Sequence, residues 1–272
     1  GVYMTEITIG DTPPDTRAFD ARSGDKLWSF KTVAQPGDPN HAAAWLDDGW
    51  KRRMGVNHWG WYFTADEQRN IIYTTIGSPA GNYWGGDRPG TNLYGNSVVA
   101  LDATTGKYLW HFQSVHHDLW DSDQPGAPVL LDVKVDGKVS PALGLISKTA
   151  WLFILDRPTG RPLFGVEERP VPKGDAPGEW YSPTQPFPLK PPPISRQRLT
   201  ESELTDITPA KREAAAHRTV LQQIADGAVE TPGQQVVRPI EAAMASVQPL
   251  VTVTSRSGGT GVSNTTTTWW SS

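Results

Sequence analysis

Short apolar runs of β-type residues alternate with polar turn residues along the first 165 positions of the chain. The runs 97–101 and 151–155 are rich in valine, leucine and aromatic residues, and each ends at an aspartate that opens a turn. A second short aromatic run, such as 109–112, follows the turn. A strand, a tight turn and another strand are the signature of a β-hairpin. The pattern therefore predicts an all-β fold for this part of the chain.

The turns themselves repeat as Asp-x-x-x-Gly-x-x-x-Trp. Residues 20–28 and 102–110 are full copies, and residues 156–164 are a third copy in which phenylalanine replaces tryptophan. Glycine supplies the positive φ that such a turn needs, and the aspartate can cap the backbone amides of the turn. The tryptophan offers a flat surface to the next unit. Hairpins that repeat with periodic glycine and aromatic residues predict radially arranged sheets, a β-propeller.

The length of the chain predicts only part of a propeller. A closed propeller needs at least four blades of about 40–50 residues each. Three copies of the motif are visible, and their starts lie 82 and 54 residues apart. A long functional insertion that carries the tryptophan-rich segment 57–62 is expected in the wider gap. We therefore interpret residues 1–199 as a partial propeller of about three to four blades.

The remainder of the chain has a different character. Residues 165–193 are proline-rich and extended, which predicts a long surface connection without a helix. Thr208 is a good N-cap before a proline and a run of strong helix formers that Gly227 can end. A short helical segment is therefore predicted within residues 200–227. Residues 228–272 have low complexity, and we expect this tail to be poorly ordered.

Composition and charge narrow the classes of function. The 26 glycines, 24 prolines and 12 tryptophans among 272 residues fit an all-β protein with many turns. A net charge of −4 without a cluster of Lys and Arg argues against a nucleic-acid partner. We expect no transmembrane segment, because no apolar run is long enough, and we recognise no signal peptide. The lack of cysteine excludes thiol catalysis, disulfides and c-type haem attachment.

Two tryptophan-rich segments hold the candidate chemistry. In residues 57–62 two tryptophans flank a glycine, so one indole can pack inside while the other faces a cavity. Residues 116–123 concentrate three carboxylates, Asp118, Asp121 and Asp123, beside histidine. Such a cluster is costly unless a cation or solvent compensates the charge, and carboxylate oxygens suit a hard metal ion.

The residues around these segments resemble the dehydrogenases that depend on pyrroloquinoline quinone (PQQ), in their glucose-dehydrogenase-like branch. The resemblance runs from about residue 5 to about residue 215 and is strong between residues 59 and 193. The motifs that carry it are residues 91–102, 112–121, 166–172 and 178–188.

The resemblance implies an eight-bladed propeller that binds the quinone near its axis and oxidises an alcohol or an aldose. In this family the cofactor lies on an indole, a position that Trp59 matches, and Asn57 is a further candidate for binding the cofactor. Asp121 matches the general base, which takes the hydroxyl proton of the substrate as hydride passes to the quinone. Lys148 matches the basic residue that hydrogen-bonds the quinone oxygens.

The resemblance also implies a metal ion, usually Ca²⁺, with Asp121, Ser78, Glu6 and Asp123 as candidate ligands. Ser78 stands in a Gly-Ser-Pro turn where the family has Gly-Asn-Pro, and its neutral hydroxyl is a poorer ligand. Glu6 is the acid placed to match an early ligand. Asp123 resembles the extra carboxylate of lanthanide-using relatives, but the glucose-dehydrogenase branch carries an acid there too. A lanthanide and Mg²⁺ therefore stay open beside Ca²⁺.

Three functions are open from the sequence. The first is a PQQ-dependent dehydrogenase that acts on CH–OH donors, with a small alcohol or sugar as substrate and a quinone or dye-type electron acceptor. For this enzyme the resemblance implies a periplasmic location, and we expect the chain alone to have little or no activity. The second is a noncatalytic propeller scaffold for protein–protein contacts. The third is a glycan-binding or glycan-hydrolysing domain, since exposed tryptophans and paired acids also suit sugars.

Overall fold

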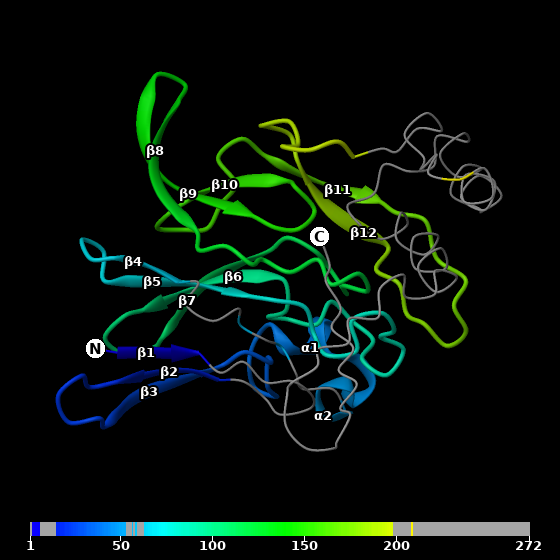
Figure 1. Ribbon diagram of the computed structural model, residues 1–272, viewed down its shortest axis with the longest axis horizontal. Helices are drawn as coiled ribbons and strands as arrows, with labels where there is room; N and C mark the ends of the chain where they lie inside the picture. The colour runs from blue at the N-terminus through cyan, green and yellow to red at the C-terminus, as the bar shows by residue number, and fades with distance from the viewer. Residues whose placement is uncertain are drawn as a thin grey trace, which may run out of the picture.

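Short β-strands joined by turns and loops dominate the computed structural model, which describes residues 2–5, 15–52, 56, 58, 63–197 and 208. The strands form four antiparallel sheets that follow one another in chain order (Figure 1). Each sheet consists of strands that are consecutive in the sequence, as in the blades of a propeller. The predicted partial propeller of three to four blades is therefore confirmed, and we name the sheets blades A to D.

Each blade is an antiparallel meander of two to four strands. Blade A contains β1 (Val2–Thr5), β2 (Asp15–Phe19) and β3 (Lys26–Lys31), and blade B contains β4 (Phe63–Asp66), β5 (Ile71–Ile76), β6 (Ser97–Asp102) and β7 (Tyr108–Gln113). Blade C contains β8 (Val129–Val135), β9 (Lys138–Ile146) and β10 (Leu152–Asp156), and blade D contains β11 (Val166–Pro170) and β12 (Thr184–Pro188). Three short helical segments lie in the insertion between β3 and β4: α1 (His41–Ala44), η1 (Leu46–Asp48) and α2 (Gly49–Arg52).

The repeated turns have the predicted conformation. In blade B, the Asp102 carboxylate accepts the backbone N–H groups of Thr104 and Thr105 at 3.1 and 2.8 Å. Gly106 adopts a φ of 70° and donates its N–H to the Asp102 carbonyl at 2.8 Å. The first copy repeats this arrangement with Asp20 and Gly24. In the third copy Asp156 accepts the Thr159 N–H, whereas Pro158 has no N–H to donate. Aspartate capping and a left-handed glycine thus close each hairpin turn.

The third copy differs because proline occupies the strand that should follow its turn. Leu155 pairs with Pro162 only as an isolated bridge, and the Leu163 N–H bonds the Ile154 carbonyl at 2.8 Å. Proline has no N–H to donate to a ladder, so this hairpin is cut short after the turn.

The tryptophans of the repeat connect neighbouring blades, as predicted. The Trp28 indole Nε1–H in blade A donates to the Ala103 carbonyl in the turn of blade B at 3.1 Å. The Trp110 Nε1–H in blade B donates in the same way to the Arg157 carbonyl in the turn of blade C at 3.2 Å. Both indoles are buried. A buried indole needs a partner for its N–H, and the next turn supplies it.

The hydrophobic core lies between the blades, with blade B in the middle. The side chains of β6 alternate between two clusters, as the two faces of a strand require. Val99 and Leu101 pack with Trp28 of blade A, whereas Val98 and Ala100 pack with Phe153 of blade C. Burial on both faces explains why β6 is an uninterrupted apolar run in the sequence.

Residues 165–193 form a sheet where we expected a loop. The chain is extended and contains no helix there, as predicted, but β11 and β12 pair antiparallel with Glu168 opposite Pro186. Three prolines lie within these two strands. Proline is tolerated because each strand has a neighbour on one side only within the described part of the chain, so a missing N–H can face away from the ladder.

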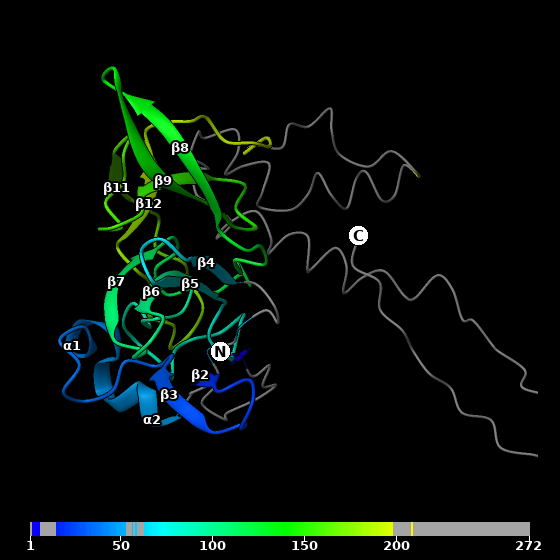
Figure 2. The same cartoon turned by 90° about the vertical axis from the view of Figure 1, so that its left-hand side faces the viewer.

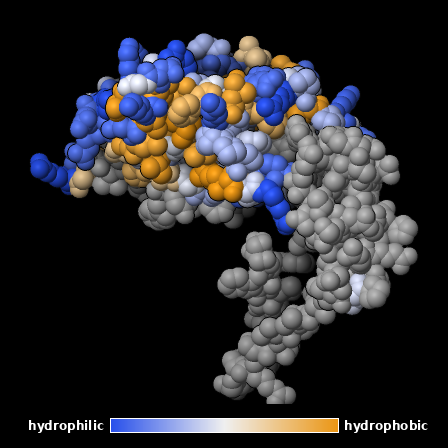
Figure 3. Space-filling model, turned by 90° about the horizontal axis from the view of Figure 1, so that it is seen from above, coloured by the Kyte–Doolittle hydropathy of each residue, from blue (hydrophilic) through white to orange (hydrophobic). Residues whose placement is uncertain are grey.

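Hairpin β8–β9 projects beyond the rest of blade C (Figures 1 and 2). Val129 and Val139 on this hairpin are exposed. The face of the molecule seen from above carries patches of hydrophobic side chains among hydrophilic ones (Figure 3).

None of the helices in the described part of the chain has the length and apolar character of a membrane span. The predicted helix within 200–227, apart from Thr208, and the tail 228–272 lie outside the described residues.

Candidate active site

Two loops at the ends of strands bring the predicted aspartates and lysine together. The Lys148 ammonium lies 2.8 Å from Oδ2 of Asp121 and 2.7 Å from Oδ2 of Asp123. The backbone N–H of Lys148 also donates to the Asp123 carbonyl at 3.0 Å. Lys148 follows β9 in blade C, and the two aspartates follow β7 in blade B. Residues that are 25 and 27 positions apart in the sequence thus share one ion-pair cluster.

The two aspartates of this cluster have different exposure. The Asp121 side chain is 30% exposed and the Lys148 side chain 37%, whereas the Asp123 side chain is 6% exposed. Asp121 and Lys148 can therefore contact a ligand that enters from solvent, while the buried Asp123 forms an ion pair with Lys148.

The pKa values of the two aspartates move apart. Burial, together with the nearby Asp123 charge, raises the pKa of Asp121 to about 6 against the opposing effect of Lys148. Burial also disfavours the Asp123 carboxylate, but hydrogen bonds from Lys148 and from the Ser78 N–H outweigh it, so the pKa of Asp123 is lowered. A carboxyl group poised near neutral pH beside one that stays ionised is the arrangement that general base catalysis uses.

Ser78 lies next to the cluster, as its position in the Gly-Ser-Pro turn predicts. Its backbone N–H donates to Oδ1 of Asp123 at 2.7 Å. Its hydroxyl donates to Oδ2 of Asp118, and the residue is buried. The hydroxyl of Ser78 is therefore already used within the protein.

Asp118 organises the loop that carries the cluster, a role that we did not predict. It is fully buried, and its Oδ2 also accepts the Asn96 amide at 3.0 Å and the Ser122 N–H at 2.7 Å. Its Oδ1 accepts the Trp120 N–H at 3.0 Å. A carboxylate with several short hydrogen-bond donors is stable in a buried position. The Asp-x-Trp-Asp spacing was the signal in the sequence, because Asp118 is close enough to fold back on the next four residues.

Asn82 is a second residue that we did not predict. Its side-chain amide donates to Oδ1 of Asp121 at 2.9 Å. Asp121 is thus held on both oxygens, by Asn82 on one and by Lys148 on the other. Asn82 lies in the loop between β5 and β6 outside any recognisable motif, so only the fold brings it to the site.

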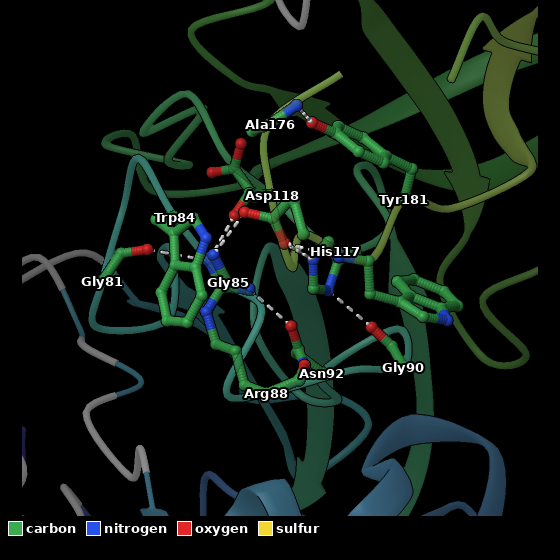
Figure 4. A network of polar contacts seen from close by, with 12 residues as sticks. Gly81, Trp84, Gly85, Arg88, Gly90, Asn92, His117, Asp118, Ala176 and Tyr181 are labelled. Carbon is green, nitrogen blue, oxygen red and sulfur yellow. Dashed lines mark hydrogen bonds and ion pairs between the residues drawn. The ribbon is translucent and has the colours of Figure 1, made fainter. Parts of the chain in front are cut away.

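A buried polar network supports the same loops from behind (Figure 4). The fully buried Arg88 donates to the carbonyls of Gly81 at 3.0 Å and Asp118 at 2.6 Å. His117 places Nε2 3.2 Å from Glu179, which comes from the loop between β11 and β12. Burial lowers the pKa of His117, although the Glu179 carboxylate opposes this effect. The network joins the β5–β6 loop of blade B to the loop of blade D.

Three predicted site residues, Trp59, Asn57 and Glu6, lie outside the described residues. His58, between the first two, is described and fully buried. Its Nδ1 lies 2.9 Å from the Thr75 carbonyl on β5 and its Nε2 lies 2.8 Å from the Thr16 hydroxyl on β2. Burial lowers its pKa to about 4, so the ring is neutral and donates through Nδ1 while it accepts through Nε2.

The cluster has the donor chemistry for a cation, but only part of a coordination shell. Asp121 and Asp123 direct one oxygen each at a single positive charge, which Lys148 supplies. Carboxylate oxygens of this kind are what Ca²⁺ and related hard ions prefer. Within the described part of the chain, no group of three or more His, Asp or Glu side chains is arranged to hold a metal ion.

Comparison with known proteins identifies the family. Residues 2–266 match the family model described as PQQ: glucose/ethanol/alcohol dehydrogenase, β-propeller domain. The match extends beyond residue 215, where we expected the resemblance to end. The chain is 40% identical over 213 residues to the quinate/shikimate dehydrogenase (quinone) of Acinetobacter baylyi, covering 77% of the chain and 26% of that protein. It is 39% identical over 188 residues to the quinoprotein glucose dehydrogenase of Escherichia coli, covering 69% of the chain and 23% of that protein.

Solved structures agree on the fold. The quinohemoprotein alcohol dehydrogenase from Comamonas testosteroni superposes with a TM-score of 0.51 at 26% identity, over 68% of this chain and 30% of that one. A europium-containing methanol dehydrogenase superposes with a TM-score of 0.52 at 21% identity, over 66% of this chain and 35% of that one. The chain spans about a quarter of the length of the curated relatives named above. From its match to the family model over nearly its whole length, we conclude that the chain belongs to the family of PQQ-dependent quinoprotein dehydrogenase β-propellers.

Proposed function

We propose that the protein to which this chain belongs oxidises a small alcohol or sugar by hydride transfer to PQQ, with Asp121 as the general base. The observation that carries the proposal is the environment of Asp121. This carboxylate is partly exposed, has a pKa raised to about 6 by burial, and is oriented by Asn82 at 2.9 Å and Lys148 at 2.8 Å. It can accept a proton near neutral pH while both oxygens keep a defined position.

The roles of the neighbouring residues follow from their contacts. Asp121 takes the hydroxyl proton of the substrate as the C–H bond breaks. Lys148, whose side chain is 37% exposed, can hydrogen-bond the oxygens of a quinone while it balances the charge of the two aspartates. We assign the stacking position to Trp59, with Asn57 close to it. When bound, PQQ would supply the hydride acceptor, and a metal ion held by Asp121 and Asp123 would supply electrophilic assistance.

We assign the metal ion to Asp121 and Asp123, with Ser78 and Glu6 as further candidates. The support is that the Asp121 and Asp123 carboxylates converge on one positive charge, the Lys148 ammonium. We propose Ca²⁺, with a lanthanide or Mg²⁺ as the alternatives, because all three are hard ions that prefer oxygen ligands.

The electron acceptor and the compartment are also part of the proposal. The name of the Acinetobacter baylyi relative includes a quinone, which supports a quinone-type acceptor. A periplasmic location is proposed from the family resemblance. Fusion of the protein to a reporter enzyme that is active only outside the cytoplasm tests the location, and an inactive reporter in cells that make the fusion protein would contradict it.

The direct test is reconstitution of the purified protein with PQQ and Ca²⁺. We expect uptake of the quinone, measured by quenching of tryptophan fluorescence, and reduction of an artificial dye in the presence of alcohols or aldoses. Asp121→Asn should abolish turnover and leave quinone binding within a few-fold. Asp25→Asn, which removes an exposed carboxylate in the first turn, is the matched control and should retain turnover.

Two outcomes would contradict the proposal. Failure of the unsubstituted protein to bind the quinone would remove the assigned activity. Retained turnover in Asp121→Asn would remove Asp121 as the base. A noncatalytic scaffold, the alternative function, offers no reason for a partly exposed lysine and two aspartates to share one charge cluster.

A further inference from the structure

Glu179 belongs to blade D but is buried against the loops of blade B. Its side chain is 1% exposed, and that of its partner His117 is 0% exposed. Its Oε1 lies 3.2 Å from Nε2 of His117 and accepts the Trp180 N–H at 2.8 Å. Its Oε2 accepts the Gly85 N–H at 2.7 Å. A surface loop has therefore placed a carboxylate where it bonds two separate segments of another blade.

These two segments meet again at the proposed base. Gly85 lies three residues after Asn82 in the β5–β6 loop, and His117 lies four residues before Asp121 in the segment after β7. Asn82 and Asp121 are joined by the amide–carboxylate hydrogen bond at 2.9 Å. The β5–β6 loop and the segment after β7 are thus joined twice. The Asn82–Asp121 hydrogen bond joins them at one place, and Glu179 joins them at the other through Gly85 and His117.

The segment that carries Asp121 needs such support, because its backbone is strained. His117 has a φ of 47° and Asp121 a φ of 56°, both in the left-handed region. Residues other than glycine remain in that region only when surrounding contacts hold them there. Both ring nitrogens of His117 face acceptors, since Nδ1 lies 2.9 Å from the Gly90 carbonyl and Nε2 lies 3.2 Å from Glu179, so the neutral ring donates to one of them and the protonated ring to both.

The two loops also fit together too closely to move independently. A Cβ atom at Gly85 would lie 2.9 Å from His117 Nε2, and one at Gly86 would lie 2.2 Å from the Gly178 carbonyl oxygen. The Trp84 indole Nε1–H donates to the Pro177 carbonyl at 3.4 Å. A shift of the blade D loop is therefore transmitted to the β5–β6 loop.

The negative charge of Glu179 stabilises its contacts with Gly85 and His117. Burial alone disfavours the Glu179 carboxylate, but hydrogen bonds from His117 and the Gly85 N–H outweigh it, so the pKa of Glu179 is lowered. The ionised carboxylate makes its hydrogen bonds in a site without water exposure, where they are strong.

We propose that Glu179 is a positioning residue for the general base: through Gly85 and His117 it sets the hydrogen bond between Asn82 and Asp121. The inference rests on the proposed function, because it assigns Glu179 a role in the reaction of Asp121. Glu179 itself touches neither of these side chains in the described contacts, and it acts through the two loops.

A double-mutant cycle tests the proposal on the protein reconstituted with PQQ and Ca²⁺. Glu179→Leu removes the hydrogen bonds, Asn82→Leu removes the bond to the base, and the double variant combines them. We expect Glu179→Leu to lower kcat by up to about 100-fold, because small misplacements of reacting groups have effects of that size. Quinone affinity should change less than about threefold, since the hydrogen bonds of Glu179 join it to Gly85, His117 and Trp180. In the Asn82→Leu background the same substitution should have little further effect on kcat.

The conservative variant Glu179→Gln tests whether the hydrogen bonds of Glu179 or its negative charge matters for kcat. The carboxamide of Glu179→Gln can accept the Gly85 N–H and donate to Nε2 of a neutral His117, so this variant should recover most of kcat. Should Glu179→Leu fail to fold, Glu179→Asp replaces it in the cycle, because it keeps the charge but withdraws the carboxylate by one methylene.

Hydrogen exchange gives a readout that needs neither quinone nor turnover. Amides in residues 81–88 and 115–124 should exchange faster in Glu179→Leu than in the unsubstituted protein, and Glu179→Gln should restore slow exchange in both segments. Unchanged hydrogen exchange in both segments would overturn the proposal that Glu179 positions the general base.

The outcomes keep the two proposals apart. Multiplicative effects of Glu179→Leu and Asn82→Leu on kcat, or an unchanged kcat with a lowered Tm, would show Glu179 to be structural only and overturn the inference. An unsubstituted protein that binds quinone but does not turn over would instead overturn the proposed function, and with it the role of Glu179 in the reaction.

Discussion

The indole of Trp28 in blade A covers Gly106 in the turn of blade B so closely that a Cβ atom on Gly106 would lie 2.5 Å from the ring. Trp110 covers Gly160 of blade C in the same way, with a corresponding distance of 2.3 Å. Gly106 and Gly160 therefore each have two functions. Each adopts the left-handed conformation of its own hairpin, and each admits the tryptophan of the blade before it.

Gly106→Ala should destabilise the protein more than Gly24→Ala. Both glycines have a positive φ, 70° and 79°, so alanine costs about 1–2 kcal/mol at either position. Only Gly106 is covered by an indole, whereas a Cβ atom at Gly24 meets nothing within 4 Å. Overpacking against Trp28 should add about 1–3 kcal/mol. Urea unfolding of both variants measures the difference, and equal losses would mean that the indole contact contributes nothing.

Asp118→Asn should lower the free energy of unfolding by about 1–3 kcal/mol. The amide places a donor where the carboxylate accepts hydrogen bonds only, so at least one of the N–H groups of Trp120 and Ser122 or the Asn96 amide loses its acceptor. Asp48→Asn, at an exposed position, is the control and should leave stability nearly unchanged. An equal effect in the two variants by denaturant titration would show that Asp118 does not organise the loop.

Stability should fall as the pH decreases from about 6.5 to about 4, in part because of His58. Its pKa is about 4 in the folded protein and about 6.5 in the unfolded chain, so within this window only the unfolded state binds the proton. Above pH 6.5 both states are neutral and His58 adds no pH dependence. Between pH 6.5 and pH 4, protonation of His58 in the unfolded state should lower the free energy of unfolding by about 3 kcal/mol. Thermal unfolding across this range measures it.

His58→Gln is the matched variant for this prediction. It removes the titrating ring, and its amide can replace the bonds to the Thr75 carbonyl and the Thr16 hydroxyl. The loss of stability between pH 6.5 and 4 should therefore be smaller in this variant. His111, whose pKa burial also lowers to about 4, accounts for part of the remaining loss. An identical pH profile in His58→Gln and the unsubstituted protein would contradict the assignment.

Asp123→Asn should weaken Ca²⁺ binding by at least about tenfold, because it removes one of the two carboxylates that converge on the Lys148 ammonium and to which we assign the metal ion. Isothermal titration with Ca²⁺, and separately with La³⁺, measures the affinity and the preference between the two ions. Asp48→Asn serves again as the control. Unchanged affinity in Asp123→Asn would place the metal ion elsewhere in the protein.

Local sequence rules accounted for the turns but not for the proline-rich stretch. Capping by Asp20, Asp102 and Asp156 depends on residues within three positions, so the repeat revealed it directly. The pairing of β11 with β12 depends on strands that are separated by a loop of thirteen residues. Proline content argued for a loop there, because propensity does not report that a strand has a neighbour on one side only.

What the sequence by itself determined was the hairpin repeat, which is written in a motif of fixed spacing, and the family resemblance, which implied that Asp121, Asp123 and Lys148 belong to one site. What only the tertiary structure decided was the surroundings of Asp121. Asn82 and Glu179 lie in loops without a motif, and they reach the site because blade packing brings the ends of distant strands together. Burial and hydrogen bonding, which set the pKa and the orientation of a carboxylate, come from such neighbours rather than from the residues next to it in the chain.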